Sequence, residues 1–177
     1  MMQRMIATQR INMISRRCFA SYNYTAASNS KVFLGVSKDG QEAGKLVFEL
    51  YDNHSPALAF NFATLASGPL VGTSLTKAMP GYGVQGGVTE DTERLADENL
   101  ELRHHKRGML SMLNEGSHSN GSNFVVTFGE ATYLDGYQSI VGEMVQGEDL
   151  LAKIEADSSR CGALGSEWKI SSAGEQH

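Results

Sequence analysis

Short apolar runs alternate with polar, glycine-rich segments along most of this 177-residue chain. Met109–Leu113 is one such run, too short for a helix and rich in residues that strands favour. An Asp39-Gly40 pair between two β-like runs is the pattern of a hairpin. The predicted strands are residues 31–37, 44–51, 73–78, 109–113, 124–128, 140–145 and 168–172.

Two segments show the spacing of an amphipathic helix instead. Ser55 and Pro56 are N-cap and first-turn signals for a helix that Gly68 ends, and a second helix is predicted at residues 147–156. The positions expected to face inward are Leu58, Phe62 and Leu65 in the first helix and Leu150, Leu151 and Ile154 in the second. Many short strands with two helices predict an all-β fold closed into an antiparallel barrel, because closure removes sheet edges.

The loop between two of the predicted strands, residues 114–123, has the sequence NEGSHSNGSN. A segment this polar lies at the surface, since burial would leave its backbone groups without partners. Two strands that hold such a loop in a fixed shape can present its backbone to a ligand. Composition alone favours an ordinary long hairpin loop.

Three motifs, in the same order, resemble those of the cyclophilin-type peptidyl-prolyl cis-trans isomerases. Residues 108–124 follow the frame G-x-L-S-M-x-N-x-G-x-x-(S/T)-N-G-S-(Q/N)-F. Residues 79–87 (MPGYGVQGG) resemble I-P-G-F-x-x-Q-G-G, and residues 133–144 (YLDGYQSIVGEM) resemble W-L-D-G-x-H-x-x-F-G-x-V. The resemblance implies a cyclophilin-like domain at residues 31–177, built as a closed eight-stranded antiparallel barrel with a helix over each end.

The reaction of that family needs no nucleophile, metal or cofactor. The barrier is the partial double bond of the amide before proline, about 18–20 kcal/mol for peptide bonds in general. When the bond is twisted the proline nitrogen becomes a better hydrogen-bond acceptor. A catalyst therefore needs a donor aimed at that nitrogen, an apolar slot for the proline ring and anchors for the peptide.

The resemblance places this machinery on residues that depart from the family pattern. The donor is an arginine in the family and is Lys77 here, while Gln85, which supports that arginine, is retained. Lysine keeps the charge but lacks the planar fork of donors. The positions implied for substrate binding are Tyr82, Gly83, Leu113, Asn114, Asn123, Val125, Tyr133, Leu134 and Gln138.

Most of these substrate-binding positions are altered. Gly83 and Val125 stand where the family has Met and Phe, so we expect a shallow, partly wet proline slot, and Leu134 is unchanged. Asn114 matches the family, whereas Tyr133 replaces a tryptophan and Gln138 a histidine. Two interpretations follow. One is a structural or protein-binding subunit with weak or no isomerase activity, and the other is an active isomerase that assists folding in the mitochondrial matrix.

The mitochondrial expectation comes from the N-terminal segment. Residues 1–38 contain no Asp or Glu, and Arg4, Arg10, Arg16 and Arg17 supply the charge of the first twenty. An Arg-rich, acid-free, moderately amphipathic stretch followed by serines is typical of a transit peptide, here residues 1–30. Residues 17–21 (RCFAS) resemble a processing site after Phe19. A disordered basic arm is the alternative, and an uncleaved arm is expected to lie against partner subunits in a complex at the matrix face of the inner membrane.

Composition excludes other classes. The net charge of −5 argues against broad binding to nucleic acid, and no apolar run approaches the ~20 residues that span a bilayer. Two distant cysteines, Cys18 and Cys161, are no disulfide framework. The run His104-His105-Lys106-Arg107 is interpreted as a solvated turn, because adjacent histidines in a strand point to opposite faces and cannot share a metal. The sequence shows no Ser-His-Asp grouping. The partners expected are proline-containing peptide segments or partner subunits.

Overall fold

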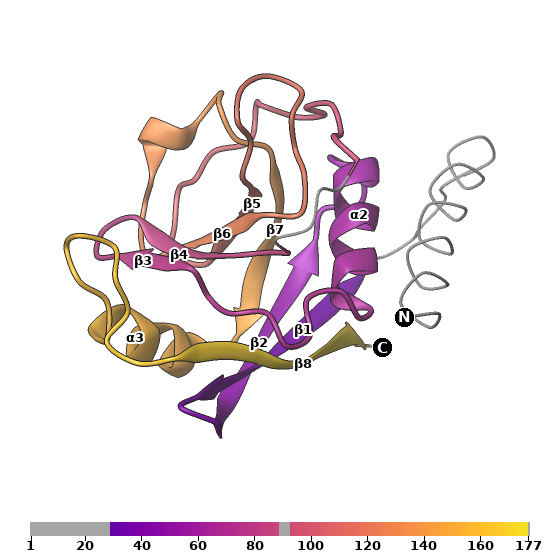
Figure 1. The fold of residues 1–177 in the computed structure, drawn as a ribbon. Helices are drawn as coiled ribbons and strands as arrows, with labels where there is room; N and C mark the ends of the chain where they lie inside the picture. Colours follow the sequence, from indigo (N-terminus) through magenta and orange to yellow (C-terminus); the bar gives the residue numbers. More distant parts are fainter. Residues whose placement is uncertain (1–28, 89–92, 177) are drawn as a thin grey trace.

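The computed structural model describes residues 29–88 and 93–176, so the predictions for the N-terminal arm lie outside the described residues. The described part folds into eight strands, two α-helices and one 3-10 helix (Figure 1). The elements are β1 (Lys31–Lys38), β2 (Gln41–Leu50), α2 (Pro56–Ala66), β3 (Lys77–Met79), β4 (Gly83–Gly86), β5 (Met109–Met112), β6 (Phe124–Thr127), η1 (Thr132–Leu134), β7 (Ile140–Gln146), α3 (Glu148–Ala156) and β8 (Trp168–Gln176).

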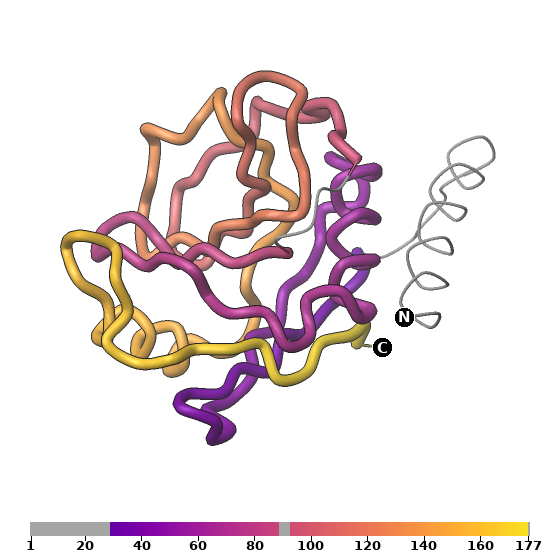
Figure 2. The backbone as a smooth tube through the Cα atoms, in the orientation of Figure 1, coloured from indigo at the N-terminus to yellow at the C-terminus, as the bar shows by residue number. Residues whose placement is uncertain are grey.

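All eight strands belong to one antiparallel sheet with the order β3-β4-β6-β5-β7-β2-β1-β8. The sheet curls, and the first and last strands of the described chain, β1 and β8, lie side by side (Figure 2). The segment just before β3 contacts β8 through an isolated bridge between Ser74 and Lys169, with Leu75 N donating to Trp168 O at 2.9 Å. The predicted all-β antiparallel fold with two helices is confirmed, but β3 and β8 share no ladder, so the strand pairing forms a curled sheet and does not show the closed barrel.

The interior of the curled sheet holds the hydrophobic core. The two helices lie at different ends, α2 against β1, β7 and β8 and α3 against β2, β3 and β4 (Figure 1). All six inward positions predicted for the helices are buried. Phe62 of α2 meets Phe48 and Phe124 edge to face, with ring centroids 6.4 and 5.4 Å apart. Each such buried side chain contributes about 1.5–3 kcal/mol of apolar burial.

The hairpin predicted at Asp39-Gly40 is confirmed. Both residues have positive φ, 49° and 82°, as the tight turn between β1 and β2 requires. The predicted strand at residues 73–78 differs, because residues 73–75 bond to β8 and β3 begins only at Lys77. The strand β4 was not predicted, since its sequence GVQG has little strand preference of its own and is held by β3 and β6 on either side.

The N-terminus of α2 is capped from elsewhere in the chain. Ser55 is the N-cap residue, but its buried hydroxyl donates to Ile140 O at 3.1 Å instead of closing the helix. The carboxylate of Glu98 accepts hydrogen bonds from Ala57 N and Leu58 N, at 3.0 and 2.8 Å. The prediction of the helix start is therefore correct and that of its side-chain cap is wrong.

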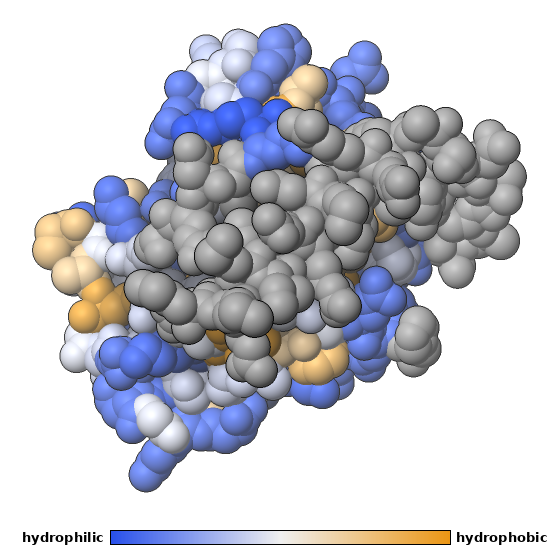
Figure 3. All heavy atoms as spheres, turned by 45° about the vertical axis from the view of Figure 1, so that its right-hand side comes forward, coloured by the Kyte–Doolittle hydropathy of each residue, from blue (hydrophilic) through white to orange (hydrophobic). Residues whose placement is uncertain are grey.

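One face of the molecule can be judged from its coloured surface. In the face shown in Figure 3 hydrophilic residues dominate the coloured area, with a few apolar residues between them. None of the described helices has the length and apolar content needed to cross a membrane.

Candidate functional site

Four side chains form a row across the outer face of the sheet. Lys77 on β3 lies opposite Gln85 on β4, Gln85 opposite Val125 on β6, and Val125 opposite Ser111 on β5. Directly opposed residues project to the same face. Val125 is fully buried but stands outside the main core cluster, so the row faces outward and is covered by other segments. The structure thus brings together the predicted Lys77, Gln85 and Val125.

The exposed end of the row is Lys77. Its aliphatic stem lies against Gly162 in the loop after α3, where a Cβ on the glycine would stand 2.6 Å from Lys77 Cε. A backbone bond from Ala78 N to Gly162 O, at 3.0 Å, fixes that loop beside β3. Within the described residues the ammonium forms no ion pair. The cation is therefore positioned by packing of its stem rather than by a side-chain partner.

Gln85 is engaged by a tyrosine. Its Nε2 donates to the Tyr82 hydroxyl at 3.1 Å. The Tyr82 ring stacks on Tyr133, with centroids 6.4 Å apart and planes 25° from parallel, and the Tyr133 hydroxyl donates to Gly81 O at 3.3 Å. Burial, with the nearby Tyr82, raises the pKa of Tyr133, so this phenol is neutral at pH 7. Gln85 therefore holds the tyrosine pair in place rather than the cation.

Gly83, a predicted part of the proline slot, lies close against the neighbouring strand. A Cβ at Gly83 would stand 2.4 Å from Val126 O and 3.0 Å from Val125 Cγ2. Leu134, at the end of η1, is 8% exposed. The shallow, partly wet slot expected from the smaller residues at positions 83 and 125 stays a prediction.

The remaining predicted positions border the long loop. Asn114 Nδ2 donates to Tyr137 O at 2.7 Å, and Leu113 N donates to Asn123 O at 2.9 Å. The Asn123 side chain is exposed. Gln138 is half-buried, and its buried Oε1 has no hydrogen-bond partner in the described part of the chain. These residues line the edge of the site without converging on one atom.

The long loop is tied down by Asp97. Its carboxylate accepts from Asn120 Nδ2 at 2.7 Å and from His118 N at 2.8 Å. Burial acts to raise the pKa of Asp97, but the hydrogen bonds from His118 and Asn120 outweigh it and hold that pKa below its usual value. The loop predicted to lie at the surface is exposed over residues 115–118 and fixed at Asn120.

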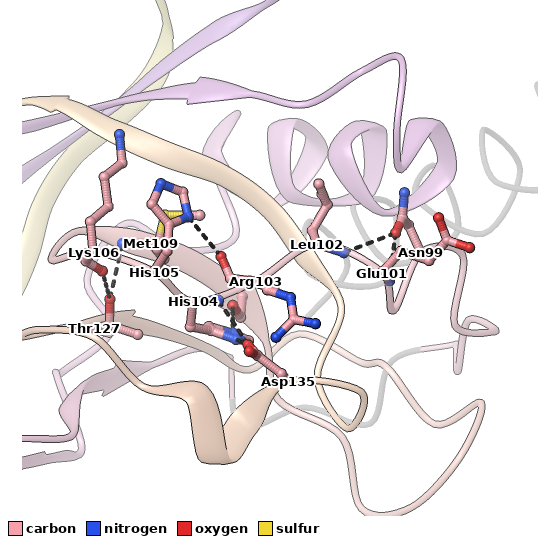
Figure 4. A network of polar contacts seen from close by, with 11 residues as sticks. Asn99, Glu101, Leu102, Arg103, His104, His105, Lys106, Met109, Thr127 and Asp135 are labelled. Atoms are coloured by element: carbon pink, nitrogen blue, oxygen red, sulfur yellow. Dashed lines mark hydrogen bonds and ion pairs between the residues drawn. The ribbon is translucent and has the colours of Figure 1, made fainter.

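His104 is the residue that sequence reasoning missed. It is fully buried, so its assignment to a solvated turn is wrong, whereas His105 is exposed as predicted. His104 Nδ1 lies 2.8 Å from Asp135 Oδ1, and its Nε2 lies 2.7 Å from Ser111 Oγ (Figure 4). Burial lowers the pKa of His104 against the opposing effect of Asp135. No pattern of spacing marks these three residues, because their contact depends on the curl of the sheet.

Ser111, His104 and Asp135 thus form a Ser-His-Asp grouping that could not be argued from the sequence. The distances match those of a hydrogen-bonded nucleophile, base and orienting acid. Ser111 is 0% exposed, however, so no substrate carbonyl reaches its oxygen. The described residues also contain no group of three or more His, Cys, Asp or Glu side chains that could hold a metal ion. What the site offers chemically is packing surface and hydrogen-bond donors.

Comparison with known proteins agrees with the motifs. A family model described as cyclophilin type peptidyl-prolyl cis-trans isomerase/CLD matches residues 34–175. A curated peptidyl-prolyl cis-trans isomerase of Encephalitozoon cuniculi (strain GB-M1) is 34% identical over 157 residues, which cover 81% of this chain and 91% of that relative.

Proposed function

Because this chain belongs to the cyclophilin-type peptidyl-prolyl cis-trans isomerase family, we propose that it binds proline-containing peptide segments or partner subunits at the site built on Lys77 and Gln85. The exposed faces of Tyr133 and Tyr137, 55% and 74% exposed, supply apolar contact area for such a segment. Proline-containing segments dock on aromatic surfaces of this kind. The close approach of Val126 O to Gly83, 2.4 Å from where a Cβ would stand, favours a peptide laid along the surface over a ring inserted into a slot.

Isomerase activity is weak or absent in this proposal. The observation that carries it is the hydrogen bond from Gln85 Nε2 to the Tyr82 hydroxyl, at 3.1 Å. In the family the glutamine amide supports the arginine at position 77, but here the Gln85 amide is bound to Tyr82 instead. The Lys77 stem packs on Gly162. Without that support the flexible Lys77 ammonium is not held in a fixed position toward the proline nitrogen, so it stabilises the twisted amide less well.

The second candidate function is an active isomerase that assists protein folding. It is favoured by one observation, that Lys77 and Gln85 are direct cross-strand partners on the same face. A cation and an amide donor so placed provide slow turnover on a narrow set of peptides.

A coupled isomerisation assay on several X–Pro peptides separates the two candidates. We expect the unmodified protein to show kcat/KM far below the diffusional range of about 10⁸ M⁻¹s⁻¹. Lys77→Arg combined with Tyr82→Phe, which frees Gln85, is expected to raise kcat/KM more than either change alone. Lys153→Arg, an exposed cation on α3, is the matched control. Turnover near the diffusional range in the unmodified protein would contradict the binding-subunit proposal.

We further propose a mitochondrial location and a place in a larger assembly. The support is the Arg-rich, acid-free sequence of residues 1–38. The endogenous protein is expected to co-purify with mitochondria and to migrate on native gels above its own 19.2 kDa. Migration as a free monomer would rule out the assembly, and an intact mass that begins at Ala20 would rule out a retained arm.

A further inference from the structure

The buried triad, which consists of Ser111, His104 and Asp135, joins two parts of the site that are distant in sequence. Ser111 ends the row Lys77–Gln85–Val125–Ser111, which forms the floor on the outer face of the sheet. Asp135 follows η1, the short helix that carries Tyr133 and Leu134 and forms the wall. His104 lies between them, with one ring nitrogen toward each.

The backbone of His104 holds the same wall twice more. Its N–H donates to Asp135 Oδ1 at 2.8 Å (Figure 4). Its carbonyl accepts from Ala131 N at 2.8 Å. The segment 131–135 is therefore fixed at both ends to residue 104. The imidazole extends this connection to the floor at Ser111, while the stack of Tyr133 on Tyr82 and the bond from Gln85 to Tyr82 connect the wall to the other end of the floor.

The proton arrangement of the triad follows from its partners. The Asp135 carboxylate accepts, so Nδ1 carries the hydrogen and Nε2 is left to accept from the Ser111 hydroxyl. The charged groups that face the imidazole are Asp135 and, beyond it, Arg103, whose charge also acts on Asp135. Full burial favours the neutral ring, which satisfies both hydrogen bonds.

We propose that His104 is a positioning residue for peptide binding: its neutral ring sets the separation between the tyrosine wall at Tyr133 and the sheet floor at Ser111. This inference rests on the proposed function, since it assigns a role to a residue that no peptide touches. In this proposal the buried triad has a structural role in positioning the wall and is not a nucleophile.

Two substitutions separate the two halves of the connection. The amide of His104→Asn reaches the Nδ1 position, so it keeps the bond to Asp135 and loses Ser111. The amide of His104→Gln reaches toward Nε2, so it keeps Ser111 and loses the side-chain bond to the wall. His105→Gln is the matched control, because the His105 ring is exposed and lies 3.0 Å from the carbonyl of Arg103 rather than against the wall or the floor.

The test is the dissociation constant for a fluorescein-labelled Ala-Pro peptide, measured well below each variant's Tm. We expect His104→Gln to weaken binding about 10-fold, His104→Asn about 3-fold and His105→Gln less than 2-fold, the sizes that follow from lost positioning hydrogen bonds. A residue that only stabilises the fold would lower Tm in both His104 variants and leave the constants equal.

A second measurement is amide hydrogen exchange at residues 132–135 in the absence of peptide. Because it needs no peptide, its result does not depend on the proposed function. Faster exchange in His104→Gln than in His104→Asn is expected, and equal exchange overturns the positioning role. If the unmodified protein binds no proline peptide, the proposed function fails while the exchange result still decides the inference. Should His104→Gln not fold, Ser111→Ala and Asp135→Asn serve, with the larger effect expected for Asp135→Asn.

Discussion

Gln85 and Tyr82 are three positions apart in sequence, and their side chains meet because Tyr82 lies in the turn that joins β3 to β4. The sequence identified which residue types occupy the site, including Lys77 in place of the family's arginine. It could not show that the glutamine amide is already bound by a tyrosine. His104 is a similar case, because burial, which decides its role, depends on segments up to 31 positions away.

A prediction at this scale concerns Gly83. Gly83→Met would restore the family residue, but its Cβ would stand 2.4 Å from Val126 O. We expect the free energy of unfolding to fall by about 1–3 kcal/mol, as overpacked sites do, with no gain in peptide affinity. Chemical denaturation measures this, with Gly129→Ala as the control, since nothing lies within 4 Å of a Cβ there. Unchanged stability with tighter peptide binding would show that a proline slot does open at this position.

The elements were predicted best where a local pattern coincides with burial. Both helices and the Asp39-Gly40 hairpin follow from spacing and turn chemistry alone. The strand β4 and the cap of α2 do not, because each is completed by a distant partner. For β4 that partner is β6, and for α2 it is Glu98, about 40 residues beyond the helix start.

Glu98 is expected to stabilise α2. Its carboxylate satisfies two of the free N–H groups at the helix start and places a negative charge at the positive end of the helix. Glu98→Ala should lower the free energy of unfolding by about 0.5–2 kcal/mol, the range for a lost helix cap. Urea denaturation measures the change. Glu101→Ala, an exposed acid nearby, should differ from the unmodified protein by less than about 0.5 kcal/mol, as exposed substitutions do.

For the molecule as a whole, the sequence predicted the architecture because three family motifs occur in order within residues 79–144. It could not predict how the curled sheet is held together. Asp157 is one such link, since it accepts from Trp168 Nε1 at 2.8 Å and from Lys38 Nζ at 3.2 Å. It thus joins the end of β1 to the start of β8 from the residue after α3.

Acid should therefore destabilise the fold through Asp157. The hydrogen bond from Trp168, outweighing the effect of burial, and that from Lys38 hold the pKa of Asp157 below its usual value of 3.8. A carboxyl whose folded pKa is depressed contributes stability above the unfolded pKa, and that contribution is lost as pH falls through the folded pKa. Urea denaturation at pH 7 and pH 3 should show a loss of stability that is smaller in Asp157→Asn. An equal loss in both proteins would assign the acid sensitivity to other carboxyls.

The bridge between Ser74 and Lys169 forms a seam between the segment before β3 and β8. Each neighbouring pair of strands in the sheet is joined by a ladder of at least three residue pairs, whereas this seam consists of one bridge with three backbone hydrogen bonds between residues 72–75 and β8. Lys77 follows three residues after this seam. Because the cation lies so close in sequence to this contact, we expect any displacement of residues 72–75 from β8 to shift Lys77 relative to Tyr82 and Tyr133, and so to change the geometry of the proposed peptide site.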